Sequence, residues 1–136
     1  MTYFRVGFFA SSLLLFSSSA MAQGGSTSNE VVKQEYIPLG ESTNHIDYSA
    51  KVVECNGVNQ ILLTAFNENP TDQVADFALT VTNVDGESFS RTFNVAILKA
   101  EIYAAQCGDT AHDNLKIELP ANFDAANVQV TIVYNN

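Results

Sequence analysis

The sequence predicts an all-β fold in which short strands build two packed sheets. Three observations support this prediction. Apolar and polar residues alternate in many short segments, and this two-residue period is typical of strands with one buried face. Turn residues such as Asn56-Gly57 and Asp85-Gly86 separate the segments. The pattern includes no convincing long helix and no internal repeat, which favours a sandwich or a small barrel.

The first residues have the features of an export signal. Val6–Phe16 is an apolar run of about eleven residues, shorter than the roughly 20 that a membrane-spanning helix needs. Ala20 and Ala22 place small side chains where a signal peptidase cuts. We therefore expect residues 1–22 to be a signal peptide that is cleaved after Ala22, with an uncleaved membrane segment as the alternative.

The exported part has the size of one domain. Residues 23–30 have the Gly- and Ser-rich composition of a flexible N-terminal segment, and residues 31–136 are long enough for a single β-sandwich domain. After cleavage, 5 basic and 15 acidic residues remain, a net charge of −10. This charge disfavours nucleic acid and anionic lipid surfaces as partners. Since the acidic residues are scattered, solubility is the simpler explanation of the charge.

Alternation places most of the strands. Residues 46–52 alternate as a strand with one wet face, whereas Ile61–Phe66 is apolar on both faces and predicts a central strand. Pro70 ends it, because proline cannot extend a ladder of hydrogen bonds. Residues 115–119 and 128–134 alternate as further strands, with a turn between them.

The clearest element is a β-hairpin over residues 75–97, with its turn at Asp85-Gly86. Its two faces differ sharply in composition, which fixes the register because a slip by one residue would exchange them. We expect Phe77, Leu79, Phe89 and Phe93 to be buried, and Thr80, Ser90 and Thr92 to be wet. Arg91 is the exception on the apolar face, and we place it near the rim, where its stem can cover apolar surface.

Two features leave room for alternatives. Residues 99–106 are Ala-rich, which favours a helix, but they also alternate, and we expect a short strand leading to Cys107. The count of seven or eight strands favours an immunoglobulin-like Greek-key sandwich in architecture only. The chain has no Trp, and Tyr103 stands four residues before Cys107 rather than the two typical of a tyrosine corner.

Cys55 and Cys107 are the only two cysteines. In an exported protein an isolated pair is usually a disulfide. The alternatives are a metal site, which normally has closer spacing and more ligands, and a redox pair, which is usually Cys-X-X-Cys. We expect a structural disulfide that closes a loop of 52 residues.

The chain resembles small secreted Ig-like proteins of the Bacteroidota group over residues 46–119. The resemblance rests on Glu54–Gly57, Gln60–Leu63, Phe66-Asn67, and Cys107 shortly before Leu115–Ile117. It implies a secreted Ig-like domain with the same cysteine pairing, and it implies no activity. The members of that group often carry further cysteines, which this chain lacks.

Candidate catalytic residues are few. His112 stands in a loop between Asp109 and Asp113, and His45 stands near Asp47. Histidine beside carboxylates can bind a metal or transfer protons, but short acidic loops are common solvated turns. The sequence contains no nucleophile-elbow, zinc-protease or phosphate-loop motif. We therefore predict no enzyme, no catalytic residue, no metal ligand and no cofactor.

Three kinds of binding stay open. Calcium could use Asp109 with Asp113, or Glu68 with Asp72. Carbohydrate binding normally needs an aromatic platform, and Phe123 is a candidate that could equally plug the end of the sandwich. Assembly by strand addition would suit the last strand, which resembles that of pilin subunits, but residues 24–34 lack an alternating donor strand.

From the sequence we expect an exported, non-catalytic interaction or structural module. The alternatives are a fimbrial or matrix subunit that assembles by strand addition, and a carbohydrate- or calcium-binding domain. Its location would be the periplasm or the cell exterior, and its partner a protein or another component of the envelope or extracellular space. The sequence does not define an oligomeric state.

Overall fold

The computed structural model describes residues 28–135 of the chain. The expected signal peptide and the new N-terminus at Gln23 lie outside these residues. The described part is all-β, with eight strands and one short 3-10 helix. In chain order the elements are β1 (Glu30–Glu41), β2 (Ile46–Cys55), β3 (Val58–Asn67), β4 (Gln73–Thr82), β5 (Ser88–Ile97), β6 (Ile102–Ala104), η1 (Asp113–Leu115), β7 (Lys116–Glu118) and β8 (Gln129–Tyr134).

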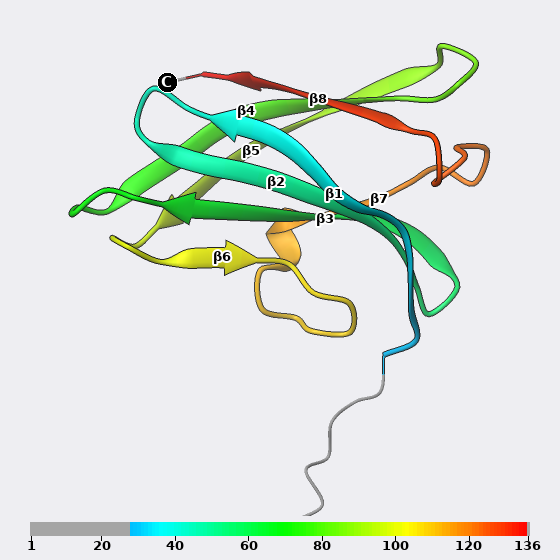
Figure 1. Cartoon of the computed structure of the whole chain (residues 1–136), viewed down its shortest axis with the longest axis horizontal. Helices are drawn as coiled ribbons and strands as arrows, with labels where there is room; N and C mark the ends of the chain where they lie inside the picture. Colours follow the sequence, from blue (N-terminus) through cyan, green and yellow to red (C-terminus); the bar gives the residue numbers. More distant parts are fainter. Residues whose placement is uncertain (1–27, 136) are drawn as a thin grey trace, which may run out of the picture.

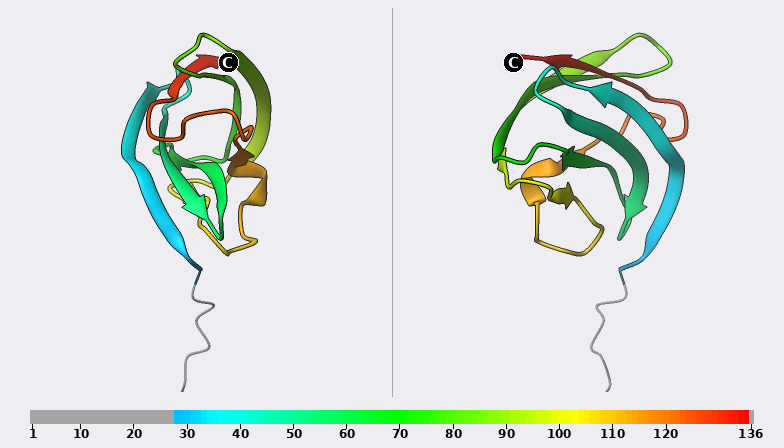
Figure 2. Two further views of the ribbon diagram at one scale, coloured as in Figure 1. Left: turned by 90° about the vertical axis from the view of Figure 1, so that its right-hand side faces the viewer. Right: turned by 60° about the vertical axis from the view of Figure 1, so that its left-hand side comes forward.

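The strands form two antiparallel sheets that pack face to face (Figures 1 and 2). The five-stranded sheet has the order β1-β2-β3-β6, with β7 also paired to β3, and the three-stranded sheet has the order β5-β4-β8. The expected sandwich and its strand count are therefore confirmed. The immunoglobulin-like order is not confirmed, because β2 and β3 pair with each other, whereas the second and third strands of an immunoglobulin constant domain lie in different sheets.

The predicted hairpin is present. β4 and β5 pair over their full length without a register shift, and Phe77 lies opposite Phe93. The predicted faces are confirmed for Phe77, Leu79 and Phe93, which are buried, and for Ser90 and Thr92, which are exposed, whereas Phe89, expected to be buried, and Thr80, expected to be wet, are both half-buried. Thr80, Ser90 and Thr92 lie on the other face, where the two hydroxyls of Thr80 and Ser90 are 2.7 Å apart.

Arg91 sits at the rim as expected. Its guanidinium carbon lies 5.5 Å from the centre of the Phe93 ring, and its Nη1 donates a hydrogen bond to the carbonyl of Lys116 at 3.0 Å. The side chain is exposed, and its guanidinium lies over the Phe93 ring at the edge of the core.

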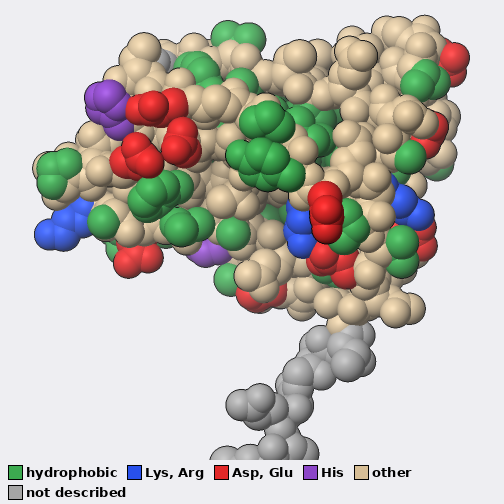
Figure 3. Space-filling model, viewed as in Figure 1, with side chains coloured by type: hydrophobic (Ala, Val, Ile, Leu, Met, Phe, Trp, Pro, Cys, Tyr) green, Lys and Arg blue, Asp and Glu red, His purple; other side chains and the backbone are tan. Residues whose placement is uncertain are grey.

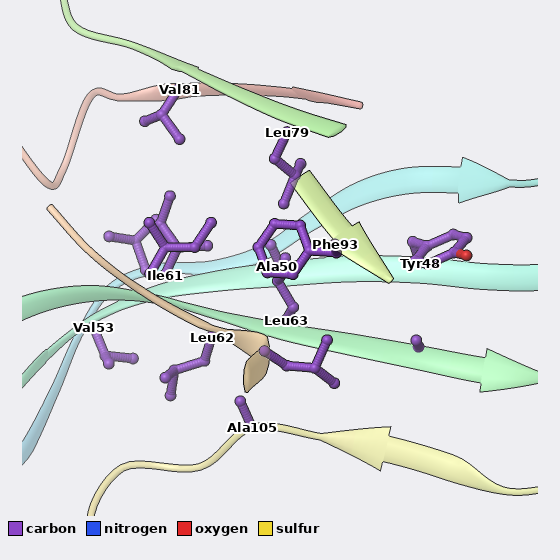
Figure 4. Close-up of a cluster of buried hydrophobic side chains, with 14 of the residues drawn as sticks. Tyr48, Ala50, Val53, Ile61, Leu62, Leu63, Leu79, Val81, Phe93 and Ala105 are labelled. Atoms are coloured by element: carbon purple, nitrogen blue, oxygen red, sulfur yellow. The ribbon is translucent and has the colours of Figure 1, made fainter. Parts of the chain in front are cut away.

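β3 is central, as its apolar character on both faces predicts. It pairs with β2 along its whole length and with β6 and β7 on its other side. Figure 4 shows Val53 and Leu62 on the opposite side of the sheet from Leu79, Val81 and Phe93. Both faces of the sheet thus bury apolar side chains at this point, and Ala105 lies on the same side as Val53 and Leu62.

The Ala-rich segment contains a strand, as expected. Residues 102–104 form β6, so pairing with β3 outweighs the helix propensity of this segment.

Residues 120–127 form turns, and Phe123 is buried there, with its ring edge-on to Phe89 at 5.5 Å. Phe123 therefore plugs the end of the sandwich.

β1 is the strand that alternation does not reveal. It is twelve residues long and begins at Glu30, the last residue of the expected flexible segment. Its pairing with β2 contains three register shifts, and each adds a residue on the β1 side. Because every added residue reverses the following side chains, the apolar residues of β1 follow no two-residue period.

Candidate functional site

The candidate site lies on the outer face of the five-stranded sheet, the face that points away from the three-stranded sheet. At the middle register shift of β1, Glu35 and Tyr36 together stand opposite Lys51. Bulges of this kind re-aim side chains and are common beside functional sites. The Tyr36 side chain is 69% exposed, the largest exposure of any large apolar residue of the described part.

Two shallow hollows flank the Tyr36 ring. The first has a volume of about 190 Å³ and is lined by Tyr36, Pro38, Gly40, Asp47, Tyr48, Ser49, Thr64 and Phe66. The second has a volume of about 110 Å³ and is lined by Glu35, Tyr36, Ser49, Ala50, Lys51, Leu62, Thr64 and Ala105. Tyr36, Ser49 and Thr64 border both hollows. We call this surface the Tyr36 site.

The register of β2 and β3 fixes the order in which the site residues follow one another along the strands. Asp47 lies opposite Phe66, Ser49 opposite Thr64, and Lys51 opposite Leu62. The first hollow uses the Asp47 end, and the second uses the Lys51 end. Tyr36 thus borders two hollows that follow one another along β2 and β3, and we call the two hollows together the channel. Figure 3 views this side of the molecule and shows hydrophobic side chains gathered near its centre.

Polar groups at the site are available to a ligand. Within residues 28–135, the hydroxyls of Ser49 and Thr64 and the carboxylate of Asp47 accept or donate no hydrogen bond to another protein group. Hydroxyls can both donate and accept, while an ionised carboxylate only accepts. The channel therefore offers donors and acceptors next to an apolar ring.

The lysines of this sheet are already paired with carboxylates. Lys51 Nζ lies 2.6 Å from Glu30 Oε1, and Lys33 Nζ lies 2.9 Å from Glu54 Oε2. Each positive charge beside the channel is thus balanced by an acid of β1 or β2. The site has no surplus positive charge to attract an anionic ligand.

The disulfide supports one wall of the site. Cys55 and Cys107 are bonded as predicted, with Cα atoms 5.6 Å apart. The bond ties the segment after β6 to the end of β2, and the amide of Ala105 donates to the carbonyl of Leu63 at 2.9 Å. Ala105 then forms part of the second hollow. The bond is typical of proteins from an oxidising compartment.

The His112 loop is held by an ion pair and by a contact between two rings. Lys116 Nζ lies 2.6 Å from Asp113 Oδ1 and also donates to the carbonyl of Asp109. The His112 ring stacks on Tyr103, with ring centres 4.4 Å apart. The structure thus brings Asp113 and Lys116 together, and His112 against an aromatic ring.

His45 and the Glu68–Asp72 segment lie at the other end of the strands. His45 Nδ1 is 2.5 Å from Glu41 Oε1, and Asp72 Oδ1 accepts the amide of Lys99 at 2.9 Å. Among residues 28–135, His, Cys, Asp and Glu side chains nowhere gather in threes that could hold a metal ion. Of the calcium candidates named from the sequence, Asp109, through its carbonyl, and Asp113, through its carboxylate, both contact Lys116 Nζ, and Asp72 accepts the amide of Lys99.

Both histidines occupy positions with left-handed backbone. The φ angle is 53° at His45 and 61° at His112. Among residues other than glycine, His, Asn and Asp are enriched in this region. This gives each histidine a structural reason to stand in its turn.

Larger hollows occur at the ends of strands. One of about 460 Å³ is lined by Asn44, Asp72, Gln73, Val74 and Ala96, and one of about 370 Å³ by Gly57, Val58, Asn59, Glu118, Leu119 and Ala121. Neither includes an aromatic side chain. We regard the Tyr36 site as the stronger candidate because an exposed ring and free polar groups converge there.

Sequence reasoning missed the Tyr36 site. The segment from Val31 to Gly40 contains Tyr36 and Pro38 close together, and a proline in an apolar segment is a signal of an edge strand. An edge strand that carries an aromatic residue could have marked the site. Phe66 was expected only as part of a central strand.

Comparison with protein-family models, with curated proteins and with solved structures found no significant match to this chain. Within residues 28–135, no helix has the length and apolar character needed to cross a bilayer.

Proposed function

We propose that this chain is an exported, non-catalytic binding module whose ligand binds at the Tyr36 site. The observation that carries the proposal is the 69% exposed ring of Tyr36, which a bulge in β1 places between two hollows. A single exposed aromatic side chain is common at protein surfaces and needs no functional explanation by itself. The Tyr36 ring, however, borders two hollows whose hydroxyls and carboxylate bond no other group within residues 28–135, so one ligand could bury the ring and bond these groups.

The non-catalytic part of the proposal rests on how the titratable groups are used. Both histidines occupy left-handed turn positions, and their rings contact Glu41 and Tyr103. Neither borders the two hollows beside Tyr36. A module that binds through an exposed ring and hydroxyls needs no group that transfers protons.

The location follows from two further features. The N-terminal residues have the pattern of a cleaved signal, and the disulfide suits an oxidising compartment. We propose the periplasm or the cell exterior. We also propose that the sandwich is immunoglobulin-like only in its layered architecture, because β2 and β3 share a sheet.

Retention on envelope material tests the function. The mature protein from Gln23 would be incubated with the sedimentable envelope fraction of the cells that produce it, and the bound share measured. We expect Tyr36→Ala to lose binding and Val133→Ala to keep it. Val133 is a matched control because it is 63% exposed but lies on the three-stranded sheet. Equal retention of all three proteins, or none of the wild type, would contradict the proposal.

A second candidate function is assembly by strand addition at β5. This ten-residue strand pairs with β4 alone among the described residues and contains no proline or register shift, and its one charged residue, Arg91, donates to the carbonyl of Lys116. Natural edge strands usually carry such protection against edge-to-edge pairing, as β1 does with Lys33, Pro38 and its bulges. Sedimentation velocity should then show concentration-dependent association that Thr92→Lys abolishes, and a monomer at all concentrations would exclude this role.

A further inference from the structure

We infer that the Tyr36 site binds a neutral polysaccharide chain, which lies along β2 and β3 and stacks one sugar ring on Tyr36. This inference rests on the proposed function and specifies its ligand class. It combines the shape of the channel, the chemistry of its lining and its charge.

The shape favours an extended ligand. Pockets that enclose compact small molecules usually have volumes of about 300–1,000 Å³. The two hollows are about 190 and 110 Å³, and they lie on either side of one ring. The pairs Asp47–Phe66 and Lys51–Leu62 mark the two ends of the channel. They are four residues apart along β2, which corresponds to about 13 Å. A chain of repeating units can place one unit in each hollow and pass across Tyr36.

The lining combines the two kinds of contact that a sugar ring offers. The C–H groups on the face of a sugar ring carry partial positive charge, and the face of an aromatic ring is negative. Tyr36 and the half-buried Phe66 supply aromatic surface. The hydroxyls of Ser49 and Thr64 and the carboxylate of Asp47 can bond sugar hydroxyls without giving up a bond within residues 28–135.

The charge selects a neutral polymer over an anionic one. The whole chain has a net charge of −9, and both lysines near the channel are paired with glutamates. An anionic polysaccharide would meet Asp47 and Glu35 with no unpaired cation to compensate. A neutral glycan avoids this repulsion.

A protein partner fits the site less well. A stable protein interface usually buries about 800 Å² on each side around a packed apolar core. At the Tyr36 site, the apolar core of such an interface would have to form over one exposed ring with a hollow on each side. We therefore assign the ligand as a glycan and keep a protein partner as an outcome of the test.

Affinity electrophoresis tests the inference directly. The mature protein would be run in native gels that contain soluble xylan, β-glucan, galactomannan or starch, and in a gel that contains dextran sulfate as the anionic control. We expect retardation by at least one neutral polysaccharide and none by dextran sulfate. Tyr36→Ala should weaken the affinity at least about tenfold, which corresponds to about 1.4 kcal/mol, while Val133→Ala should stay close to the wild type.

The inference is overturned if no neutral polysaccharide retards the protein, if dextran sulfate alone does so, or if Tyr36→Ala migrates like the wild type. A second measurement separates this failure from failure of the proposed function. Envelope material would be treated with periodate, which cleaves sugar diols, or with a protease. Loss of Tyr36-dependent retention after periodate alone supports the glycan. Loss after protease alone leaves a binding module at Tyr36 whose ligand is a protein, and it refutes the glycan.

Discussion

The β4–β5 hairpin and β1 show two opposite ways to build a strand in this molecule. β4 and β5 are ten residues each and pair without any shift, so alternate side chains fall cleanly into the core or into water. β1 is longer, but three register shifts interrupt its pairing with β2. The regular hairpin buries its aromatic rings, whereas the irregular strand leaves Tyr36 raised above the surface. The regular hairpin thus contributes to the core, and the ligand-binding role that we propose belongs to β1.

The largest effect that this comparison predicts is at Phe77. Its ring is fully buried, between Tyr48 at 4.8 Å and Phe93 at 4.7 Å. Phe77→Ala would remove this contact and leave a cavity, so we expect a loss of about 3–5 kcal/mol of unfolding free energy. Urea denaturation followed by circular dichroism measures it. A loss below about 1 kcal/mol would show that the hairpin is not the centre of the core.

The next largest effect is expected at the disulfide. Cys55→Ala should lower the unfolding free energy by about 2–5 kcal/mol, because the bond closes a loop of 52 residues. Since the bond also holds Ala105 in the wall of the second hollow, the variant should bind more weakly even where it is still folded. Cys55→Ala/Cys107→Ala serves as the control for a reactive free thiol. Full stability of that double variant would contradict the structural role of the bond.

The hairpin and the disulfide were predictable because each depends on a local or compositional signal. Apolar and polar residues alternate visibly wherever the strand register is regular. An isolated pair of cysteines in an exported chain usually forms a disulfide. β1 was not predictable by the same reasoning. Its bulges break the period, and only pairing with β2 defines which of its residues face outward.

The candidate site was not predicted from the sequence for a related reason. Its polar groups, Ser49 and Thr64, lie on different strands and become neighbours only through the register of β2 and β3. Tyr36 could be noticed in the sequence, but its exposure depends on a bulge. The two histidines are titratable and stand near carboxylates in the sequence, and the structure places both at left-handed backbone positions. The site therefore lies where local patterns are weakest, as expected for functional regions.

Alkaline pH tests the packing where the two sheets meet. Burial raises the pKa of Tyr48 to about 12, while the unfolded chain ionises its tyrosines near pH 10. Below pH 10 the phenol is neutral in both states. Between pH 10 and 12 the unfolded state loses its proton first, so the stability should fall with rising pH.

Urea denaturation at pH 9 to 12 measures this loss of stability. Tyr48→Phe is the matched control, because it keeps the ring against Phe77 and removes the ionising hydroxyl. The control should lose less stability over this range. Identical pH profiles for the two proteins would show that Tyr48 is not buried as a neutral phenol.

The smallest effect is expected at the histidines. His45→Asn/His112→Asn places asparagine at two positions with left-handed backbone, where φ is 53° and 61°. Asparagine tolerates this conformation, as histidine does. The variant loses only an exposed contact to Glu41 and a stacking contact on Tyr103. We expect a change within about 1 kcal/mol and unchanged retention on envelope material. A folded variant that lost a hydrolytic or metal-dependent activity would overturn the non-catalytic proposal.

The most direct test of the account compares stability and binding in one variant, Tyr36→Ala. Because this side chain is 69% exposed, its removal should change the unfolding free energy by no more than about 0.5 kcal/mol. The same protein should lose its retention on envelope material. Unchanged stability together with lost retention would show that β1 binds the ligand and that the β4–β5 hairpin stabilises the fold. A strongly destabilised variant, or a stable variant that binds like the wild type, would contradict the assignment of ligand binding to β1.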